Sequence, residues 1–420
     1  MVSIKDIFLN PFKVNLSPES VPYIFFYVVL FIINPTIALL VSMITLFCTS
    51  NPTQRQYYTF YVLLACWIGV LNMTKQLFSD QIYYAKIFVR VDTSDIFNAI
   101  WNYRGKDFLS YKEIVFNIYS VFCNLLTGAN PRAYFFILTV NIYILHFFAL
   151  HKVLFASGRS KQEVLCAVFL MAFFTPFFIQ SIHAVRQILA TGFVVYAIAY
   201  RAVEGKNNWP FLIIAFFIHN TSVFFILLAL LPYLYKKLET KQIFVFLFVF
   251  GLFTVFYVQV GALLNAMDIG AMSSIGRRLV SADSSGASKL FSLRAFYSYA
   301  IPIIIASFFI MKREYKDESQ TPILCFSYLS ILTFLLILGF SGASTVQFRY
   351  MFYLYSFIPF VLLFPGEYGK ELQRIFSYVV TIFFVFRFFL VDTDWSKFAD
   401  WGEILMNPFI HFWNTTYYIV

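Results

Sequence analysis

The sequence predicts an all-α polytopic integral membrane protein. Only 12% of its 420 residues are charged, whereas soluble proteins average about 25%. The mean hydropathy is +0.74, and apolar runs long enough to span a bilayer recur along the chain. We therefore expect residues 1–420 to form a single transmembrane domain.

About eleven hydrophobic segments account for most of the chain. They cover Val21–Phe47, Tyr57–Met73, Arg132–Leu150, Val164–Ile182, Ala184–Val203, Phe211–Tyr235, Ile243–Leu264, Leu293–Met311, Thr321–Phe340, Tyr350–Phe364 and Ile375–Val391. Asn34 and Pro35 are expected to kink the first segment. The five cysteines have no CxxC spacing, which favours packing roles over a disulfide framework.

Three polar stretches separate or follow these segments. Residues 74–131 predict a long extracytoplasmic loop, in which YKEIVFNIYSVFCNLL has the pattern of an amphipathic helix at the membrane surface. Residues 265–292 are rich in Gly and Ser and predict a flexible extracytoplasmic loop. Residues 392–420 carry three Trp and predict an aromatic tail in the headgroup layer.

Clusters of Lys and Arg follow the third, fifth, sixth, eighth and tenth segments, and such clusters favour the cytoplasm. Simple alternation cannot place all of them on one side. A re-entrant helical hairpin over residues 207–237, turning at His219, would do so; one continuous tilted span is the alternative. With the hairpin, the loop 74–131 and the arginines discussed below approach the outer face.

The most informative stretch is Ser181–Ser222. If it is helical, His183, Arg186 and Gln187 share one face, and His219 and Ser222 close the stretch. Ionisable residues at membrane depth are costly, so each is a candidate functional residue. The alternative for Arg186 is a span-end arginine that reaches the headgroups, and for His219 a structural hydrogen-bonding group.

The run Arg186-Gln187-x-x-Ala190, followed by Phe217-x-His219-x-x-Ser222, resembles the EpsG family, which is related to the Wzy O-antigen polymerases. The resemblance implies a glycosyltransferase of the bacterial cytoplasmic (inner) membrane that polymerises exopolysaccharide, capsule or O-antigen. Donor and acceptor would be polyprenyl-pyrophosphate-linked glycans, joined on the extracytoplasmic side with release of polyprenyl pyrophosphate. Membrane lipids, a flippase and a chain-length regulator are the other partners it implies.

The resemblance also suggests roles for individual residues. Arg186 and the late Arg349 would contact the pyrophosphate, because a guanidinium matches phosphate oxygens. His219 would polarise or position the reacting groups, and Asp95 would take the acceptor proton. The weaker substrate-binding candidates are His183, Gln187, Ser222, Asp92, Arg277, Arg278 and Arg294, and for each of the last three arginines plain surface charge is the simpler interpretation.

No cofactor, metal or nucleic acid is expected. The sequence lacks GxxxxGK[ST], GxGxxG after a strand, GxSxG and HExxH, so nucleotide, dinucleotide and serine-hydrolase chemistry have no motif. His183 and His219 lack a third metal ligand, and Asp392 and Asp394 are interpreted as a polar span boundary. Two functions remain as alternatives: a ligase that uses the same lipid-linked donor, and a non-enzymatic polysaccharide transporter or flippase.

Overall fold

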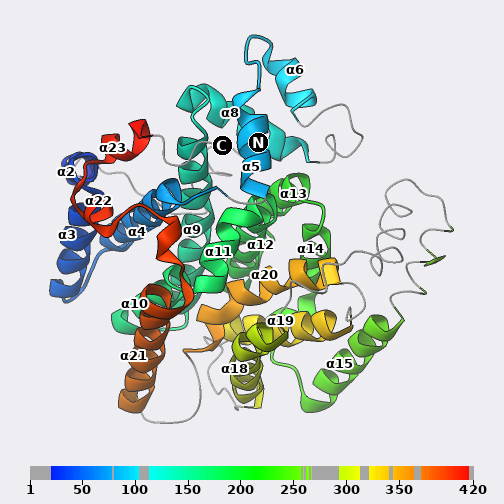
Figure 1. The fold of residues 1–420 in the computed structure, drawn as a ribbon. Helices are drawn as coiled ribbons and strands as arrows, with labels where there is room; N and C mark the ends of the chain where they lie inside the picture. The colour runs from blue at the N-terminus through cyan, green and yellow to red at the C-terminus, as the bar shows by residue number, and fades with distance from the viewer. Residues whose placement is uncertain are drawn as a thin grey trace, which may run out of the picture. The chain divides into compact units, whose positions relative to one another are not determined.

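A computed structural model describes residues 20–77, 80–103, 113–256, 259, 262, 263, 266, 293–312, 321–339, 344–363 and 370–415. Within these ranges the chain is helical and contains no strand (Figure 1). Its contacts define two compact units. The first unit comprises Met1–Lys152, Val168–Ile226 and Ile382–Val420, and the second comprises Val153–Ala167 and Leu227–Thr381. The expected single transmembrane domain stays a prediction.

Four stretches are long and apolar enough to cross a membrane: Gln54–Thr74, Pro131–Ala156, Thr321–Leu338 and Arg374–Asp392. Shorter apolar helices cover Val21–Ile33, Pro35–Cys48, Ile114–Thr127, Trp209–Ile218 and Ala300–Met311. These helices confirm an all-α protein with the apolar helices of a membrane protein. The number of crossings and the sidedness of the loops stay predictions.

The first predicted segment forms two helices, α2 (Ser20–Ile33) and α3 (Pro35–Cys48). Asn34 separates them, and its side-chain oxygen accepts the Ile37 N–H at 2.9 Å. Pro35 begins α3, where its missing N–H has no cost. The expected kink at these two residues is confirmed. The next helix, α4 (Gln54–Thr74), begins with a capping box formed by Thr53 and Gln56.

The predicted loop 74–131 contains three described helices, α5 (Asp80–Val89), α6 (Ile96–Trp101) and α8 (Ile114–Thr127). Helix α8 lies beside α5, α6 and α13 (Trp209–Ile218). Its buried side includes Asn117, Ser120 and Asn124, whereas its exposed side is apolar, with Ile118, Phe122, Leu125 and Leu126. The predicted amphipathic helix is therefore present, and its exposed apolar side fits a membrane surface.

Helix α9 (Pro131–Ala156) follows, and it approaches α12 (Val185–Glu204) closely at Gly192. A Cβ on Gly192 would lie 3.1 Å from Leu145, so only a glycine fits there without a shift of that side chain. Between them the chain forms α10 (Lys161–Ala172) and α11 (Thr175–His183). In the first unit, α12 packs against α11 and α13.

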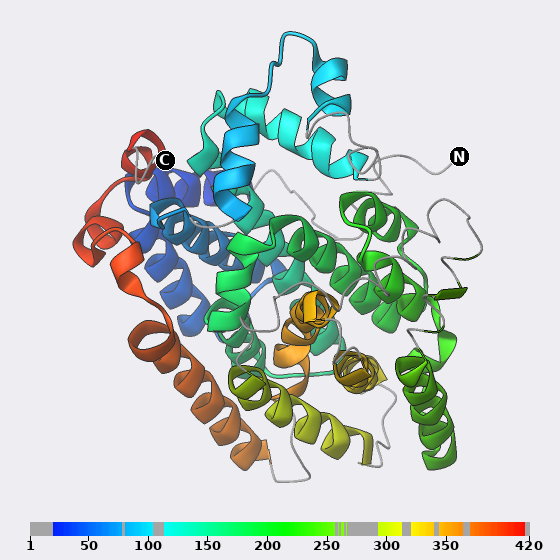
Figure 2. The same cartoon turned by 45° about the vertical axis from the view of Figure 1, so that its right-hand side comes forward.

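Helix α13 ends at Ile218, and α14 (Ser222–Leu230) begins after a break at His219–Thr221. The break lies where the hairpin was expected to turn. Entry and exit on one side of a membrane stay a prediction. Figure 2 shows the first-unit helices α5, α8, α11, α12 and α13 from a second direction.

The C-terminal tail forms η7 (Trp395–Lys397), α22 (Trp401–Met406) and α23 (Phe409–Asn414). It packs on the N-terminal helices: Asn34 Nδ2 donates to the Leu405 carbonyl at 2.9 Å, and Phe412 is fully buried against Val70 and Met73. This part of the predicted aromatic tail is therefore folded against protein. Its place in a headgroup layer stays a prediction.

The second unit is built around α19 (Thr321–Gly339). It packs against α15 (Thr240–Val255), α18 (Leu293–Lys312), α20 (Ser344–Val361) and η2 (Pro232–Tyr235). Phe326 and Phe360 stack with ring centroids 3.7 Å apart. Helix α21 (Lys370–Arg387) begins in the second unit, passes into the first unit at Ile382 and is followed by the π-helical turn Phe388–Asp392. Most of the predicted loop 265–292 lies outside the described residues.

Candidate functional site

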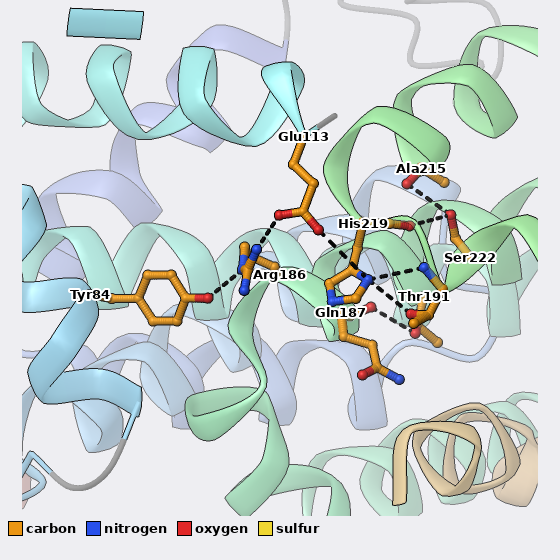
Figure 3. Close-up of polar contacts among 9 residues, drawn as sticks. Tyr84, Glu113, Arg186, Gln187, Thr191, Ala215, His219 and Ser222 are labelled. Carbon is orange, nitrogen blue, oxygen red and sulfur yellow. Dashed lines mark hydrogen bonds and ion pairs between the residues drawn. The ribbon is translucent and has the colours of Figure 1, made fainter. Parts of the chain in front are cut away.

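A polar cluster in the first unit surrounds Arg186, the second residue of α12. Its Nη1 donates to the Glu113 carboxylate, and its Nε donates to the Tyr84 hydroxyl (Figure 3). The guanidinium carbon lies 5.4 Å from the Tyr84 ring centroid and 6.0 Å from that of Phe116. The side chains of Arg186 and Glu113 are 23% and 7% exposed, so this ion pair is largely withdrawn from water. One carboxylate and two aromatic faces thus hold the cation.

Three elements bring these side chains together: α5 carries Tyr84, the residue before α8 is Glu113, and α12 begins near Arg186. A carboxylate is favoured at a helix N-terminus, which stabilises Glu113 at the start of α8. A cation is disfavoured at the same position of α12. The negative charge of Glu113 offsets this cost for Arg186. Removing either partner of such an ion pair would leave the other charge uncompensated.

His219 lies on the other side of Glu113. It follows α13 with extended backbone, and its Nδ1 accepts the Thr221 N–H at 3.1 Å. Because Nδ1 accepts this bond, the neutral ring carries its proton on Nε2. The same Nδ1 lies 4.0 Å from Glu113 Oε1. His219 is 8% exposed, so Glu113 is positioned between a buried histidine and a paired arginine.

Ser222 and Gln187 lie next to this cluster and are buried. The Ser222 hydroxyl is directed to the Ala215 carbonyl at 3.0 Å and the His219 carbonyl at 2.7 Å. Each of these carbonyls also accepts a backbone N–H, from His219 and from Ser222 respectively, so the hydroxyl adds a second bond that ties Ser222 to the end of α13 and gives it a structural role. The backbone carbonyl of Gln187 accepts a hydrogen bond from the Thr191 hydroxyl at 2.8 Å within α12.

A second polar group contains His183 and Lys75. Helix α11 ends at His183 and α12 begins at Val185, so His183 and Arg186 do not share one continuous helix as the spacing suggested. Lys75 Nζ lies 3.4 Å from His183 Nε2, which accepts because an ammonium can only donate. Lys75 is 7% exposed, and burial together with Lys397 lowers its pKa to about 8. This buried cation has no carboxylate within ion-pair distance among the described residues.

The two predicted carboxylates of the outer loop have local hydrogen bonds. Asp95 accepts the Asn98 N–H at 3.0 Å and thereby caps α6. Asp92 accepts the Ser94 N–H at 2.9 Å, and this bond lowers the pKa of its carboxyl. Neither contacts Arg186 or His219 within the described part of the chain. Asp92 lines a cleft between α5 and α6.

The predicted arginines outside this cluster lie elsewhere in the chain. Arg349 is a partly buried residue of α20 in the second unit. Arg294 is the second residue of α18, and its side chain lies outside the described set, as do Arg277 and Arg278 entirely. The structure therefore brings Arg186 and His219 together around Glu113 and leaves the other arginine roles as predictions.

Sequence reasoning missed Glu113 and Tyr84. Glu113 opens the amphipathic pattern YKEIVFNIYS, and it is buried although it is ionisable. A carboxylate just before an apolar helix was the signal that could have identified it. Tyr84 is one of many tyrosines and carries no distinguishing local signal. Within the described residues, no three His, Cys, Asp or Glu side chains are grouped to hold a metal ion.

Comparisons with known proteins give one match. The model of the EpsG family matches residues 79–409, a range that includes every residue of the Arg186 cluster. No curated protein and no solved structure matches the chain.

Proposed function

The chain belongs to the EpsG family of Wzy-like polysaccharide polymerases, and we propose that it joins polyprenyl-pyrophosphate-linked repeat units into surface polysaccharide. The observation that carries this proposal is the polar cluster of the half-buried Arg186 with the buried Glu113 and His219. The reaction would take place on the extracytoplasmic face of a bacterial cytoplasmic membrane. The energy of transfer comes from the glycosyl pyrophosphate, so the site requires no nucleotide.

Glu113 is the residue we assign to proton removal, in place of Asp95. A sugar hydroxyl attacks well only when a positioned base accepts its proton in the transition state. Asp95 is exposed and occupied in capping α6, whereas Glu113 is buried beside two other candidate residues. The Nδ1 contact of His219 with Thr221 fixes its ring, so His219 can donate to the acceptor through Nε2.

The pairing of Arg186 with Glu113 has a consequence for the reaction. In the structure the Arg186 guanidinium occupies the Glu113 carboxylate. A bound pyrophosphate competes for the same guanidinium with more charge than a carboxylate has. When Arg186 turns to the pyrophosphate, the Glu113 carboxylate is released from the guanidinium and can accept the proton of the acceptor hydroxyl. Donor binding would thereby activate the base only when a leaving group is present.

The bond changes follow from these positions. The acceptor hydroxyl oxygen attacks the anomeric carbon of the donor, and its proton passes to Glu113. The bond between the anomeric carbon and the pyrophosphate oxygen breaks, and its electron pair stays with that oxygen. Arg186 stabilises the developing charge. Lys75 with His183, and Arg349, are further candidates for phosphate contacts, while Arg277, Arg278 and Arg294 would guide the glycan.

The test is made in the native host. The chromosomal gene is replaced by Arg186→Ala or by the control Arg374→Ala, an exposed residue of α21. Membrane abundance is confirmed, and lipid-linked glycans are separated by size. We expect Arg186→Ala to lose long chains and accumulate single repeat units, while the control keeps a normal ladder. Long chains that persist on the carrier would indicate a ligase, and an unchanged ladder would refute the role of Arg186.

A further inference from the structure

The described residues contain a half-open cleft between α5 and α6, apart from the Arg186 cluster. Its volume is about 350 Å³, at the small end of the range for ligand sites. The polar and aromatic part of its wall comes from Tyr83, Arg90, Asp92, Asn98, Asn102 and Tyr103. A single stretch of chain, residues 83–103, supplies this wall, so its shape depends on the turn between the two helices.

The side chains on this wall match the surface of a sugar ring. A pyranose presents hydroxyl groups, which both donate and accept, and an apolar face of C–H groups. Asp92 can only accept, Arg90 can only donate, and the Asn98 and Asn102 amides do both. Tyr83, which is 54% exposed, offers an aromatic ring for the apolar face.

The charges of the wall favour an uncharged ligand. Arg90 and Asp92 carry opposite charges, and hydrogen bonding to Ser94 lowers the pKa of the Asp92 carboxyl, which keeps it ionised. A pyrophosphate would approach this carboxylate unfavourably, in contrast to the buried Lys75 beside the half-buried His183. The cleft therefore differs in chemistry from any site for the leaving group.

The wall of the cleft is also connected to the Arg186 cluster. The Phe116 ring of α8 contacts Tyr103 at 6.5 Å and Tyr84 at 5.9 Å between centroids. Tyr83 lines the cleft, while the adjacent Tyr84 accepts a hydrogen bond from Arg186. The same turn of α5 therefore contributes one side chain to the cleft wall and one to the Arg186 cluster.

Helix α8 fixes the two helices of the cleft relative to Glu113. Asn117 Nδ2 donates to the Ile100 carbonyl of α6 at 3.2 Å, and Asn124 Nδ2 donates to the Phe88 carbonyl of α5 at 2.6 Å. Glu113 directly precedes the same helix. A sugar held in the cleft is consequently positioned by the element that also positions the proposed base.

We propose that the cleft between α5 and α6 binds an uncharged sugar of the acceptor glycan, an assignment that rests on the proposed polymerase function. Asp92 and Arg90 hydrogen-bond to its hydroxyls, and Tyr83 covers its apolar face. The next sugar along the acceptor is then directed toward Glu113. The cleft selects the acceptor and takes no part in the bond changes.

The experiment measures binding without transfer. The probe is the free oligosaccharide released by mild acid from lipid-linked repeat units that accumulate in a host lacking the gene. Saturation-transfer NMR with the full chain in nanodiscs compares wild type, Tyr83→Ala/Asp92→Ala, and the control Phe97→Ala, whose ring is 77% exposed on α6 outside the cleft wall. We expect about tenfold weaker binding for the double variant and unchanged binding for the control.

Equal binding by wild type and the double variant, or no binding to wild type, would overturn the assignment, as would competition by inorganic pyrophosphate. Glu113→Gln separates this proposal from the proposed function. It is expected to keep oligosaccharide binding and lose polymer. Normal polymer from Glu113→Gln would refute the catalytic proposal whatever the cleft binds. Loss of polymer by Glu113→Gln, together with unaltered oligosaccharide binding by Tyr83→Ala/Asp92→Ala, would refute only the assignment of the cleft.

Discussion

Glu113 and Arg186 form a largely buried ion pair although 73 positions separate them in the sequence. Each begins a helix, and the dipoles of the two helices favour the carboxylate and disfavour the cation. Arg186 therefore depends on Glu113 for its stabilisation, whereas Glu113 is stabilised both by the dipole of α8 and by the ion pair with Arg186. This asymmetry predicts that losing Glu113, which leaves the Arg186 cation without its counterion, lowers the stability of the fold more than losing Arg186 does.

The Tyr84 side chain gives the first prediction. Tyr84→Phe removes the hydroxyl that accepts from Arg186 Nε and keeps the aromatic ring beside the guanidinium. A hydrogen bond to a charged group contributes roughly 1.5–3 kcal/mol, so we expect polymerisation to slow about 10- to 100-fold. Tyr84→Ala also removes the cation–π contact and should be slower still. The measurement is the initial rate of chain elongation in membranes. Equal rates for Tyr84→Phe and wild type would show that the hydroxyl is dispensable.

The two candidate bases can be separated by matched amide substitutions. Glu113→Gln should reduce elongation by about 10²–10⁴-fold, the usual contribution of a general base. Asp95→Asn keeps a side chain that can cap α6, so it should retain near wild-type activity. The reverse order of effects, measured at equal membrane abundance, would restore Asp95 as the base and exclude Glu113.

The helical segments were predictable because each depends on local composition. Apolar runs form helices wherever they occur, and the breaks at Asn34 and His219 follow from residues that interrupt helices or lie among polar neighbours. The break at Ala184 has no Pro or Gly to indicate it, so the sequence placed His183 and Arg186 on one face.

The site was predictable only in part, for a similar reason. Arg186 and His219 stand out as ionisable residues in apolar surroundings, and both lie beside Glu113. Which carboxylate they share depends on how α8 packs against α13, and no spacing in the sequence encodes that contact. The capping role of Asp95 was not predicted, although an Asp before a short apolar run is a usual N-cap.

Lys75 gives a prediction about pH. Its pKa is lowered to about 8 from an ordinary value of 10.5, first by burial and then by Lys397. Below pH 8 both the folded and unfolded states carry the charge, and the folded state bears the full cost of burying it. Between about pH 8 and 10.5 the unfolded state binds more protons, so stability rises with pH.

Lys75→Met removes the buried charge and should therefore raise the melting temperature at pH 7. Its advantage over wild type should shrink as the pH increases from 8 to 10.5. Thermal unfolding in detergent at several pH values is the measurement, with the exposed Lys236→Met as control. A constant difference between Lys75→Met and wild type across this range would contradict the lowered pKa.

A substitution at Ser222 distinguishes a structural role of its hydroxyl from a role in substrate binding. Ser222→Ala removes the hydroxyl that bonds to the Ala215 and His219 carbonyls, and both carbonyls keep a backbone N–H donor, so the protein should lose about 0.5–1.5 kcal/mol of stability. Buried thiols such as Cys123 and Cys325 allow unfolding to be followed with a thiol-reactive dye. At temperatures where the variant remains folded, the glycan ladder should be normal. A stable Ser222→Ala protein with shortened chains would instead indicate a contact with substrate.

We propose that Glu113, paired with Arg186, activates the acceptor for polymerisation. The most direct measurement is chain elongation by purified protein in liposomes, supplied with lipid-linked repeat units from a host that lacks the gene. Wild type and Glu371→Gln, an exposed glutamate of α21, should produce a ladder of long chains. Glu113→Gln should bind the repeat units and leave them single. A full ladder from Glu113→Gln would contradict the account.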